Sequence, residues 1–185
     1  MRKSERNLAV GVERSACILL SAAMFLAAAG CRGSGDGEPH VYSTWETLEL
    51  DKCAAAWLLK RFIDKQATFK LYPVGTLEMD GTPFDTPSSE YRRSQSLSCY
   101  ETVLQRHGVN DPRLAELGRL VRDIEVNYWT TTPAAPARNL NNRIQTIIQA
   151  GKPPAEALEE SFVVFDEFWC EMLHVGGAAG AAPKK

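Results

Sequence analysis

The sequence VYSTWETLELDKCAAAWLLKRFID, residues 41–64, changes from a strand pattern to a helix pattern at one aspartate. Residues 41–50 are rich in β-branched and aromatic side chains, which favours a strand. Residues 52–63 are rich in alanine and leucine at helical spacing, which predicts a helix that packs closely through its small side chains. Asp51 is the expected N-cap of this helix, because its carboxylate can accept hydrogen bonds from the free N–H groups of the first turn.

Glu46 is the first candidate site residue. In an extended segment 41–50 it shares a face with Leu48 and Leu50, which we expect to turn inward. A buried carboxylate needs a cation or a hydrogen-bond donor nearby. We therefore interpret Glu46 as a functional residue or as half of a structural ion pair, unless the register of the strand differs.

The remaining chain predicts another strand and four more helices. Residues 67–72 alternate apolar and polar side chains, which indicates a strand, and the proline-rich residues 75–90 predict a loop with at most a short strand around 83–85. Helix start signals stand at Ser98-x-x-Glu101, a capping box, and at Asp111-Pro112. The expected helices follow at residues 99–107, 112–128, 138–150 and 154 to about 175.

These patterns together predict an α+β domain. It is mainly helical, with about five helices and a small two- or three-stranded sheet near the N-terminal end of the domain. The core side of the helix after Asp111 is marked by apolar side chains at steps of three and four: Leu114, Leu117, Val121, Ile124 and Tyr128.

Residues 1–30 have the pattern of a bacterial signal peptide. A basic leader precedes the apolar run Ala16–Ala29, which is shorter than the ~20 residues of a membrane-spanning helix. The run ends in small residues directly before Cys31, as in the lipobox of bacterial lipoproteins, in which the cysteine is lipidated. Ala28 stands where that motif usually has leucine, so a plain signal-peptidase cut and a retained anchor remain alternatives. All three place the folded part outside the cytoplasm, in the periplasm or a similar extracytoplasmic space.

The segments behind Cys31 differ in composition. Residues 31–39 are glycine-rich and polar, which predicts a flexible tether, residues 40–176 form the domain, and residues 177–185 predict a disordered tail. The formal net charge is −2, so nucleic-acid binding gets no support. We expect a protein held to a membrane through its lipid.

The sequence contains none of the common catalytic or cofactor-binding motifs. It holds no nucleophile elbow, P-loop, HExxH motif or glycine-rich dinucleotide turn, and its three histidines lie far apart, so it specifies no metal and no cofactor. The three cysteines of the domain, Cys53, Cys99 and Cys170, form no CxxC pair. We interpret them as small buried side chains, although two of them could pair in an oxidising compartment.

Arg92 and Arg93 form the best candidate anion site. They precede the helix expected at residues 99–107, so their guanidinium groups would face the unpaired N–H groups of its first turn. This combination suits a tetrahedral oxyanion such as chromate, sulfate or phosphate. The alternative is a pair of arginines in solvent.

Arg122, Asp123 and Glu125 lie around one turn of the third helix. They cannot share its apolar stripe, so they point to solvent or toward another element. The pairs Arg119–Asp123 and Arg122–Glu125 have ordinary helix-surface spacing, which is the structural alternative to a site. Arg61 also has a structural explanation, because basic groups favourably face a helix C-terminus.

Several strings of the domain together resemble the ChrB-type chromate-resistance domain, over the range from Trp45 to Trp169. They are Ser43-Thr-Trp-Glu-Thr-Leu-Glu-Leu-Asp-Lys52, Ala56-Trp-Leu-Leu-Lys-Arg-Phe-Ile-Asp64, Pro83-Phe-Asp85, Arg92-Arg93 with Ser98-Cys-Tyr-Glu101, Asp123-Ile-Glu125 with Tyr128-Trp129, and Val164-Phe-Asp166. This domain forms the C-terminal half of cytoplasmic chromate-resistance regulators and also occurs alone as an exported protein. The resemblance implies a link to chromate or other oxyanion stress.

The resemblance also sharpens the choice of candidate residues. The charged positions inside the matching strings include Glu46, Asp51, Arg61, Asp64, Arg92, Arg93, Glu101, Asp123 and Glu125. The family pattern places a histidine near Gln95 and another at Arg122. An amide and a permanent cation at these positions disfavour a site for a transition metal and leave an oxyanion pocket intact.

Three functions follow from these expectations. The first is an exported lipoprotein that binds an oxyanion or a protein partner, with ligand-binding residues Glu46, Arg61, Arg92, Arg93, Arg122, Asp123 and Glu125. The second is an enzyme acting on chromate, which uses a metal held by carboxylates or the thiols of the domain. The third is a structural or interaction lipoprotein. The first requires that these charged side chains meet in one pocket.

Overall fold

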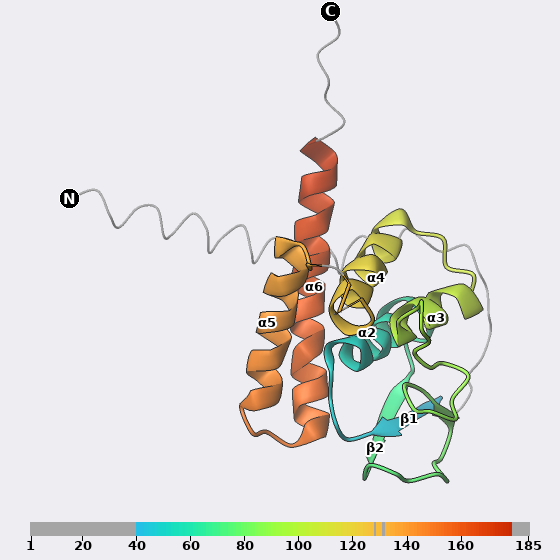
Figure 1. The fold of residues 1–185 in the computed structure, drawn as a ribbon. Coiled ribbons are helices and arrows are strands. Elements are labelled where there is room, and N and C mark those ends of the chain that lie inside the picture. Colours follow the sequence, from blue (N-terminus) through green and yellow to red (C-terminus); the bar gives the residue numbers. More distant parts are fainter. Residues whose placement is uncertain (1–39, 128, 131, 179–185) are drawn as a thin grey trace, which may run out of the picture. The chain divides into compact units, whose positions relative to one another are not determined.

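The computed structural model describes residues 40–127, 129–130 and 132–178. Along the chain its elements are β1 (Val41–Trp45), α2 (Leu50–Leu58), a π-helix η1 (Leu59–Ile63), β2 (Thr68–Tyr72), β3 (Thr82–Pro83), α3 (Cys99–Arg106), α4 (Pro112–Glu125), α5 (Ala135–Gln149) and α6 (Pro154–Ala178). Figure 1 shows the short strands at one end of a mostly helical domain. The predicted α+β class, with five α-helices and a small sheet, is confirmed within the described residues.

The sheet is parallel, with β1 in the middle of the order β2-β1-β3. The register of β1 on β2 runs from Val41 opposite Thr68 to Trp45 opposite Tyr72. Gly81 leads the chain into β3 with φ +72°, and a Cβ at this position would lie 2.1 Å from the carbonyl oxygen of Val41. Only glycine therefore lets the chain pass this close to β1.

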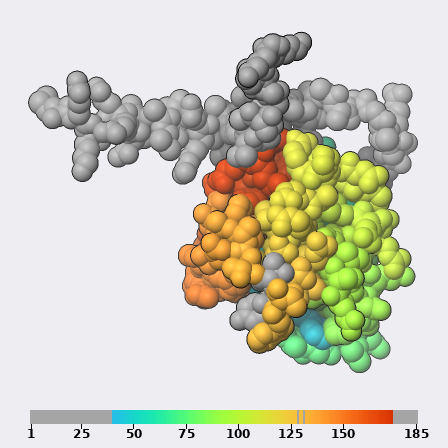
Figure 2. Space-filling model, turned by 45° about the horizontal axis from the view of Figure 1, so that its top comes forward, coloured from blue at the N-terminus to red at the C-terminus, as the bar shows by residue number. Residues whose placement is uncertain are grey.

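Helix α2 is the centre of the fold. Every residue from Leu50 to Leu58 is buried, and the helix contacts α3, α4 and α5. Its three consecutive alanines let these neighbours approach, as the sequence predicts. In Figure 2, residues of α3, α4 and α5, coloured green, yellow and orange, cover much of the face that is shown.

Arg61 of η1 joins the end of the central helix to α6. Its guanidinium group makes a two-point contact with the Asp166 carboxylate, with Nε–Oδ1 at 3.1 Å and Nη2–Oδ2 at 2.9 Å. Trp57 Nε1 donates to the same carboxylate at 2.8 Å. The sequence suggested that Arg61 faces the C-terminus of its own helix. In the structure Arg61 instead pairs with a carboxylate on another helix, α6.

Three expectations about the elements are wrong. The first strand ends at Trp45, because its partner β2 ends before Pro73, and Glu46 is exposed instead of facing the core. The first helix begins at Leu50, and its N-cap is Glu49, whose side chain makes no capping hydrogen bond. The helix expected from residue 138 begins at Ala135, because a proline in the first turn is compatible with a helix.

The other boundaries agree with the sequence to within two or three residues; α4, for example, ends at Glu125 and not at residue 128. The capping box at Ser98 and Glu101 is present, and Asp111 caps α4 by accepting hydrogen bonds from two backbone N–H groups. Leu114, Leu117 and Val121 are buried and Ile124 packs on the core, whereas Tyr128 lies outside the described residues. The predicted signal peptide, Cys31, the tether and nearly all of the tail also lie outside them. No helix within the described residues combines the length and apolar character that a membrane crossing requires.

Candidate functional site

Asp51 occupies the place where the sequence predicted an anion. Its side chain is fully buried, and it accepts hydrogen bonds from the backbone N–H groups of Cys99 at 2.7 Å and Tyr100 at 2.9 Å, in the first turn of α3. The capping box satisfies Ser98 and Glu101 beside them. The N-terminus of α3 is thus filled by a carboxylate of the protein itself, and the expectation that Asp51 caps its own helix is wrong.

Arg93 lies among three carboxylates. Its guanidinium nitrogens approach Glu49 at 2.8 Å, Asp51 at 3.3 Å and Glu125 at 3.4 Å. These carboxylates raise the pKa of Arg93, so its charge is permanent. Arg92 does not join it: this side chain is exposed, and its guanidinium donates to the carbonyl oxygen of Ser89 at 3.3 Å. The expectation that both guanidinium groups face the free N–H groups of α3 is therefore wrong: Asp51 accepts from these N–H groups, and Arg93 pairs with Asp51.

Glu125, at the end of α4, reaches back to α2. Its carboxylate lies 3.4 Å from the guanidinium group of Arg93, which also pairs with Asp51 of α2, and burial raises the pKa of Glu125 to about 7. In turn, Arg122 of α4 pairs with Glu101 of α3 at 3.0 Å. The helices α2, α3 and α4 are thus joined by Asp51, Arg93, Glu101, Arg122 and Glu125, which we call the helix-end cluster.

Gly118 lets α3 and α4 pack closely enough for this cluster to form. A Cβ at Gly118 would lie 2.9 Å from Cγ of Glu101 and 3.1 Å from the ring of Tyr100. These distances are shorter than ordinary van der Waals contacts, so glycine is needed at the crossing of the two helices.

Of the two ion pairs predicted within α4, one is present and the other is not. Asp123 is buried and pairs with Arg119 at 2.8 Å, as the spacing predicted, and it also accepts from the Asn127 amide. The predicted pair Arg122–Glu125 is wrong, because each side chain turns to a partner on another segment. Of the charged residues expected to meet, Arg93 and Glu125 do so, whereas exposed Glu46 does not.

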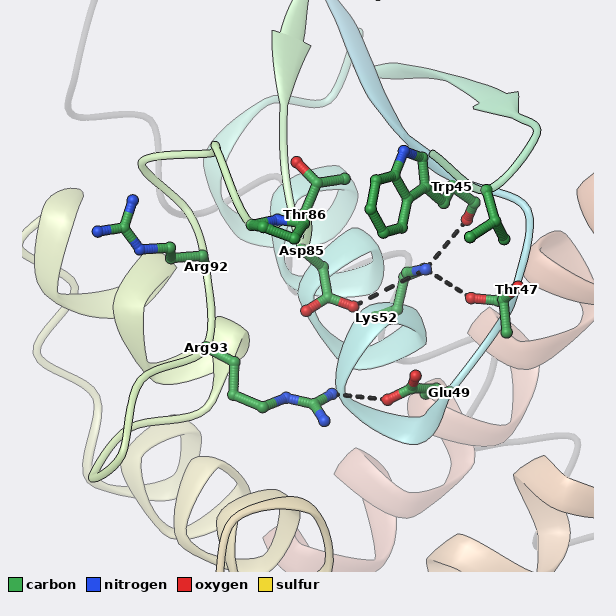
Figure 3. A pocket seen from close by; sticks show the side chains of 10 residues that line it. Trp45, Thr47, Glu49, Lys52, Asp85, Thr86, Arg92 and Arg93 are labelled. Atoms are coloured by element: carbon green, nitrogen blue, oxygen red, sulfur yellow. Dashed lines mark hydrogen bonds and ion pairs between the residues drawn. The ribbon is translucent and has the colours of Figure 1, made fainter. Parts of the chain in front are cut away.

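An open pocket with a cavity of about 420 Å³ lies over the N-terminal end of α2. Its walls include Trp45, Glu49, Lys52, Asp85 and Thr86, and Arg93 connects it to the helix-end cluster. Figure 3 shows the Asp85 carboxylate pointing toward Lys52, whereas Arg92 points away from both. The loop before β3 closes one side, where Trp45 Nε1 donates to the carbonyl oxygen of Thr76 at 2.9 Å.

Lys52 is a nearly buried ammonium group in this pocket. Its side chain is 4% exposed, and Nζ donates to the carbonyl oxygens of Trp45, at 3.0 Å, and Thr47. Its nearest carboxylate among the described residues is Asp85, at 3.9 Å. The carbonyls fix the position of the ammonium group but leave its charge without a carboxylate at hydrogen-bond distance.

Asp85 is equally unusual. Its side chain is 9% exposed, and no hydrogen-bond donor among the described residues reaches its carboxylate oxygens. Burial raises its pKa to about 7, and Asp51 nearby adds to the rise. Its φ of 49° is rare for a residue other than glycine, and such strain is often found at functional sites.

The residues Glu49, Lys52 and Asp85 were missed as site residues by reasoning from the sequence. Lys52 carried one usable signal, because it stands in the first turn of a helix whose other residues are almost all apolar. Asp85 carried none beyond its place in the Pro83-Phe-Asp85 string, because its position depends on the pairing of β3 with β1.

The thiols and the carboxylates offer little for redox or metal chemistry. Cys53 and Cys99 are buried, and burial raises the pKa of the Cys53 thiol to about 12. No disulfide joins Cys53, Cys99 and Cys170. Across the described part of the chain, no three His, Cys, Asp or Glu side chains are grouped so that they could hold a metal ion.

The fold and the site define a small α+β domain with a charged pocket at the start of its central helix. The chain belongs to the family described as ChrB, C-terminal domain, which matches residues 42–172. It is 32% identical over 98 residues to Protein ChrB of Cupriavidus metallidurans, an alignment that covers 52% of this chain and 29% of that protein. No solved structure matches the chain. The chromate-resistance family expected from the sequence is therefore confirmed.

Proposed function

We propose that this protein is an exported, lipid-anchored member of the ChrB family that binds a small oxyanion in the pocket over α2. The pocket is lined by three basic side chains, Lys52, Arg92 and Arg93, and by two acidic ones, Glu49 and Asp85. Its formal charge is thus positive, although the chain as a whole carries −2. A positive concavity attracts anions and raises their local concentration.

The observation that carries the proposal is the Lys52 ammonium group. A buried charge is stable only when it is paired and hydrogen-bonded. Lys52 has two carbonyl acceptors, but its nearest carboxylate among the described residues, that of Asp85, is 3.9 Å away and beyond hydrogen-bond distance. An oxyanion between Lys52 and Arg93 would complete this pairing, and the half-exposed Glu49 is the Arg93 partner that it would displace most easily.

The N-terminal sequence supports the rest of the proposal. The basic leader, the apolar run and the small residues before Cys31 together fit export and lipidation. Replacing Cys31 with serine should abolish incorporation of radiolabelled palmitate and release the protein from membranes. Mass spectrometry of the mature N-terminus separates lipidation at Cys31 from a plain signal-peptidase cut, since a cut elsewhere would contradict the anchor.

A structural lipoprotein is the second candidate, because one observation favours it. In the helix-end cluster each charged side chain has a partner within the protein, and the charges there are explained by folding alone. Reduction of chromate by thiols is supported less, since a buried thiol with a raised pKa offers no thiolate. Anion binding separates the first two candidates.

Isothermal titration of the full chain with chromate, sulfate and phosphate tests the proposal. The wild type should bind at least one of these anions, and Lys52→Met should bind it about tenfold more weakly or worse, because a charge-assisted contact is lost. Lys70→Met is the matched control: Lys70 is exposed, pairs with Asp80 and lies outside the pocket lining. Equal affinities for Lys52→Met and wild type, with thermal unfolding showing both folded, would contradict the site.

A further inference from the structure

We propose that Asp85 is the specificity-determining residue of this site. One hydrogen bond joins its carboxyl group to the bound oxyanion. The proton of this bond is supplied either by the protonated carboxyl group or by an O–H group of the oxyanion. This inference rests on the proposed function. It implies that the pocket distinguishes oxyanions by whether they carry a hydrogen, and that binding of a fully deprotonated oxyanion brings a proton into the pocket.

The position of the Asp85 side chain is the first support. It is nine-tenths buried, yet it has no hydrogen-bond donor among the described residues, and it points into the cavity toward Lys52 (Figure 3). Native proteins rarely leave a buried polar group without a partner. A ligand in the pocket would supply that partner.

The backbone holds Asp85 in this position. Its N–H donates to the carbonyl oxygen of Tyr91 at 2.7 Å, and the preceding N–H, of Phe84, donates to the carbonyl oxygen of Ser43 at 2.8 Å. These two bonds attach the residue to the neighbouring loop and to β1. They also stabilise the left-handed φ of 49°, so the carboxyl group is presented to the cavity by a fixed backbone.

Some of the charges around Asp85 favour ionisation of its carboxyl group and others oppose it. From α2 and the residue before it, Lys52 favours ionisation, whereas Asp51 and Glu49 oppose it. From the loop before α3, Arg93 favours it. The thiols of Cys53 and Cys99 also face this region, and burial raises their pKa values, so they stay neutral. Burial decides the result and places the pKa of Asp85 at about 7.

The two forms of Asp85 suit different anions. A protonated carboxyl group has one O–H donor, whereas an ionised one only accepts. Sulfate has no hydrogen near neutral pH, so it requires the protonated form and meets repulsion from the ionised one. Hydrogenphosphate has an O–H of its own and can donate it to the ionised form. A site that depends on such a hydrogen bond rejects a ligand that cannot complete it.

The test is titration of the full wild-type chain with sulfate and with phosphate at pH 6 and pH 8. Since one proton with a pKa of about 7 is taken up, the sulfate affinity should fall about tenfold from pH 6 to pH 8. The phosphate affinity should not fall in the same way. The heat of sulfate binding at pH 8 should depend on the ionisation enthalpy of the buffer, which shows proton uptake without any substitution.

Asp85→Asn mimics the protonated form, because its amide donates at every pH. This variant should bind sulfate at pH 8 as strongly as the wild type does at pH 6, with a pH dependence below about twofold. At pH 8 it should discriminate less between sulfate and phosphate than the wild type does, because the amide has both a donor and an acceptor. Glu46→Gln is the matched control, since Glu46 is an exposed carboxylate outside the pocket lining. It should behave as the wild type.

The outcomes separate the two proposals. Sulfate binding that is equal at pH 6 and pH 8, without proton uptake, overturns the role of Asp85 and leaves oxyanion binding in place. Equal pH profiles for Asp85→Asn and wild type do the same. Absence of any anion binding by the wild type at both pH values overturns the proposed function and this inference with it.

Discussion

Asp51 and Asp85 are two buried carboxylates near the same arginine, and they differ in what surrounds them. Asp51 accepts hydrogen bonds from two backbone N–H groups and from Arg93, all within 3.3 Å. Asp85 has no donor among the described residues, and its nearest cation is 3.9 Å away. The difference separates charges that hold the fold together from charges that remain available to a ligand.

The helix-end cluster and the pocket both include Arg93, but different parts of the chain form them. The helix-end cluster has its partners supplied by α2, α3 and α4, whose ends meet at this point. The pocket is bounded by the residues around β1 and β3, where the chain passes over the start of α2. A charged residue that matches the family strings can therefore be structural, and the family resemblance alone does not distinguish the two cases.

The largest expected effect comes from Asp51→Ala. Removing this carboxylate leaves two buried helix N–H groups without an acceptor and takes one of three carboxylates from Arg93, which should lower the free energy of unfolding by about 3–5 kcal/mol. Urea unfolding followed by circular dichroism measures the change, with Asp80→Ala on the exposed surface as the control. A loss below about 1 kcal/mol would contradict the claim that Asp51 stabilises the fold.

Gly118→Ala should have the next largest effect. The new methyl group would meet Glu101 and Tyr100 at the crossing of α3 and α4, so overpacking should lower stability by about 1–3 kcal/mol. An exposed helical glycine would give the opposite result, because alanine has the higher helix propensity. Thermal unfolding distinguishes the two, and a higher Tm would show that the helix-end cluster tolerates a wider crossing.

Asp85→Asn should raise the free energy of unfolding, unlike the two preceding substitutions, and it should do so only at high pH. A carboxyl group whose pKa is raised to about 7 on folding binds more protons in the folded than in the unfolded chain between pH 4 and 7. Stability contributed by this group therefore falls as pH rises through that window. The amide removes the fall, so the variant should exceed the wild type at pH 8 by about 1 kcal/mol or more.

Unfolding curves at pH 4.5 and pH 8 measure this difference. Near pH 4.5 the two proteins should have nearly the same stability, because Asp85 is protonated when folded. A variant that is less stable than the wild type at pH 8 would show that the Asp85 carboxylate is paired after all, as Asp51 is. Glu125, whose pKa is also raised to about 7, adds a similar fall in both proteins.

Arg61→Lys should have the smallest effect. Lysine keeps the charge but loses the two-point contact with Asp166, and the pair is partly exposed, so a loss of about 0.5–1 kcal/mol is expected. Anion binding should be unchanged, because Arg61 is outside the pocket lining. Weaker anion binding by a folded Arg61→Lys variant would return this residue to the site.

Local signals in the sequence were sufficient for most of the fold. The capping box at Ser98, the Asp111-Pro112 start and the apolar stripes act within a few residues of the chain, and the structure retains them. Asp51 shows where such signals fail. Its neighbours predicted a cap on α2, but its partner Cys99 is 48 residues away, and only the packing of α2 against α3 brings them together.

The site could be predicted only in part for the same reason. Arg93 and Glu125 were expected to meet, and they do. Glu46 was placed inward by extending the strand to Leu50, although β2 offers no partner beyond Tyr72. Lys52 and Asp85 become neighbours through the short strand β3, for which the sequence gives a weak signal.

Carbon-13 NMR of the aspartate carboxyl groups is the most direct test of the division between Asp51 and Asp85. In the free protein the Asp85 signal should titrate with a pKa of about 7, and sulfate should raise this value while leaving the Asp51 signal in place. A titration of Asp85 near pH 4 that sulfate does not change, or a response to sulfate at Asp51 alone, would contradict the assignment of the pocket as the binding region.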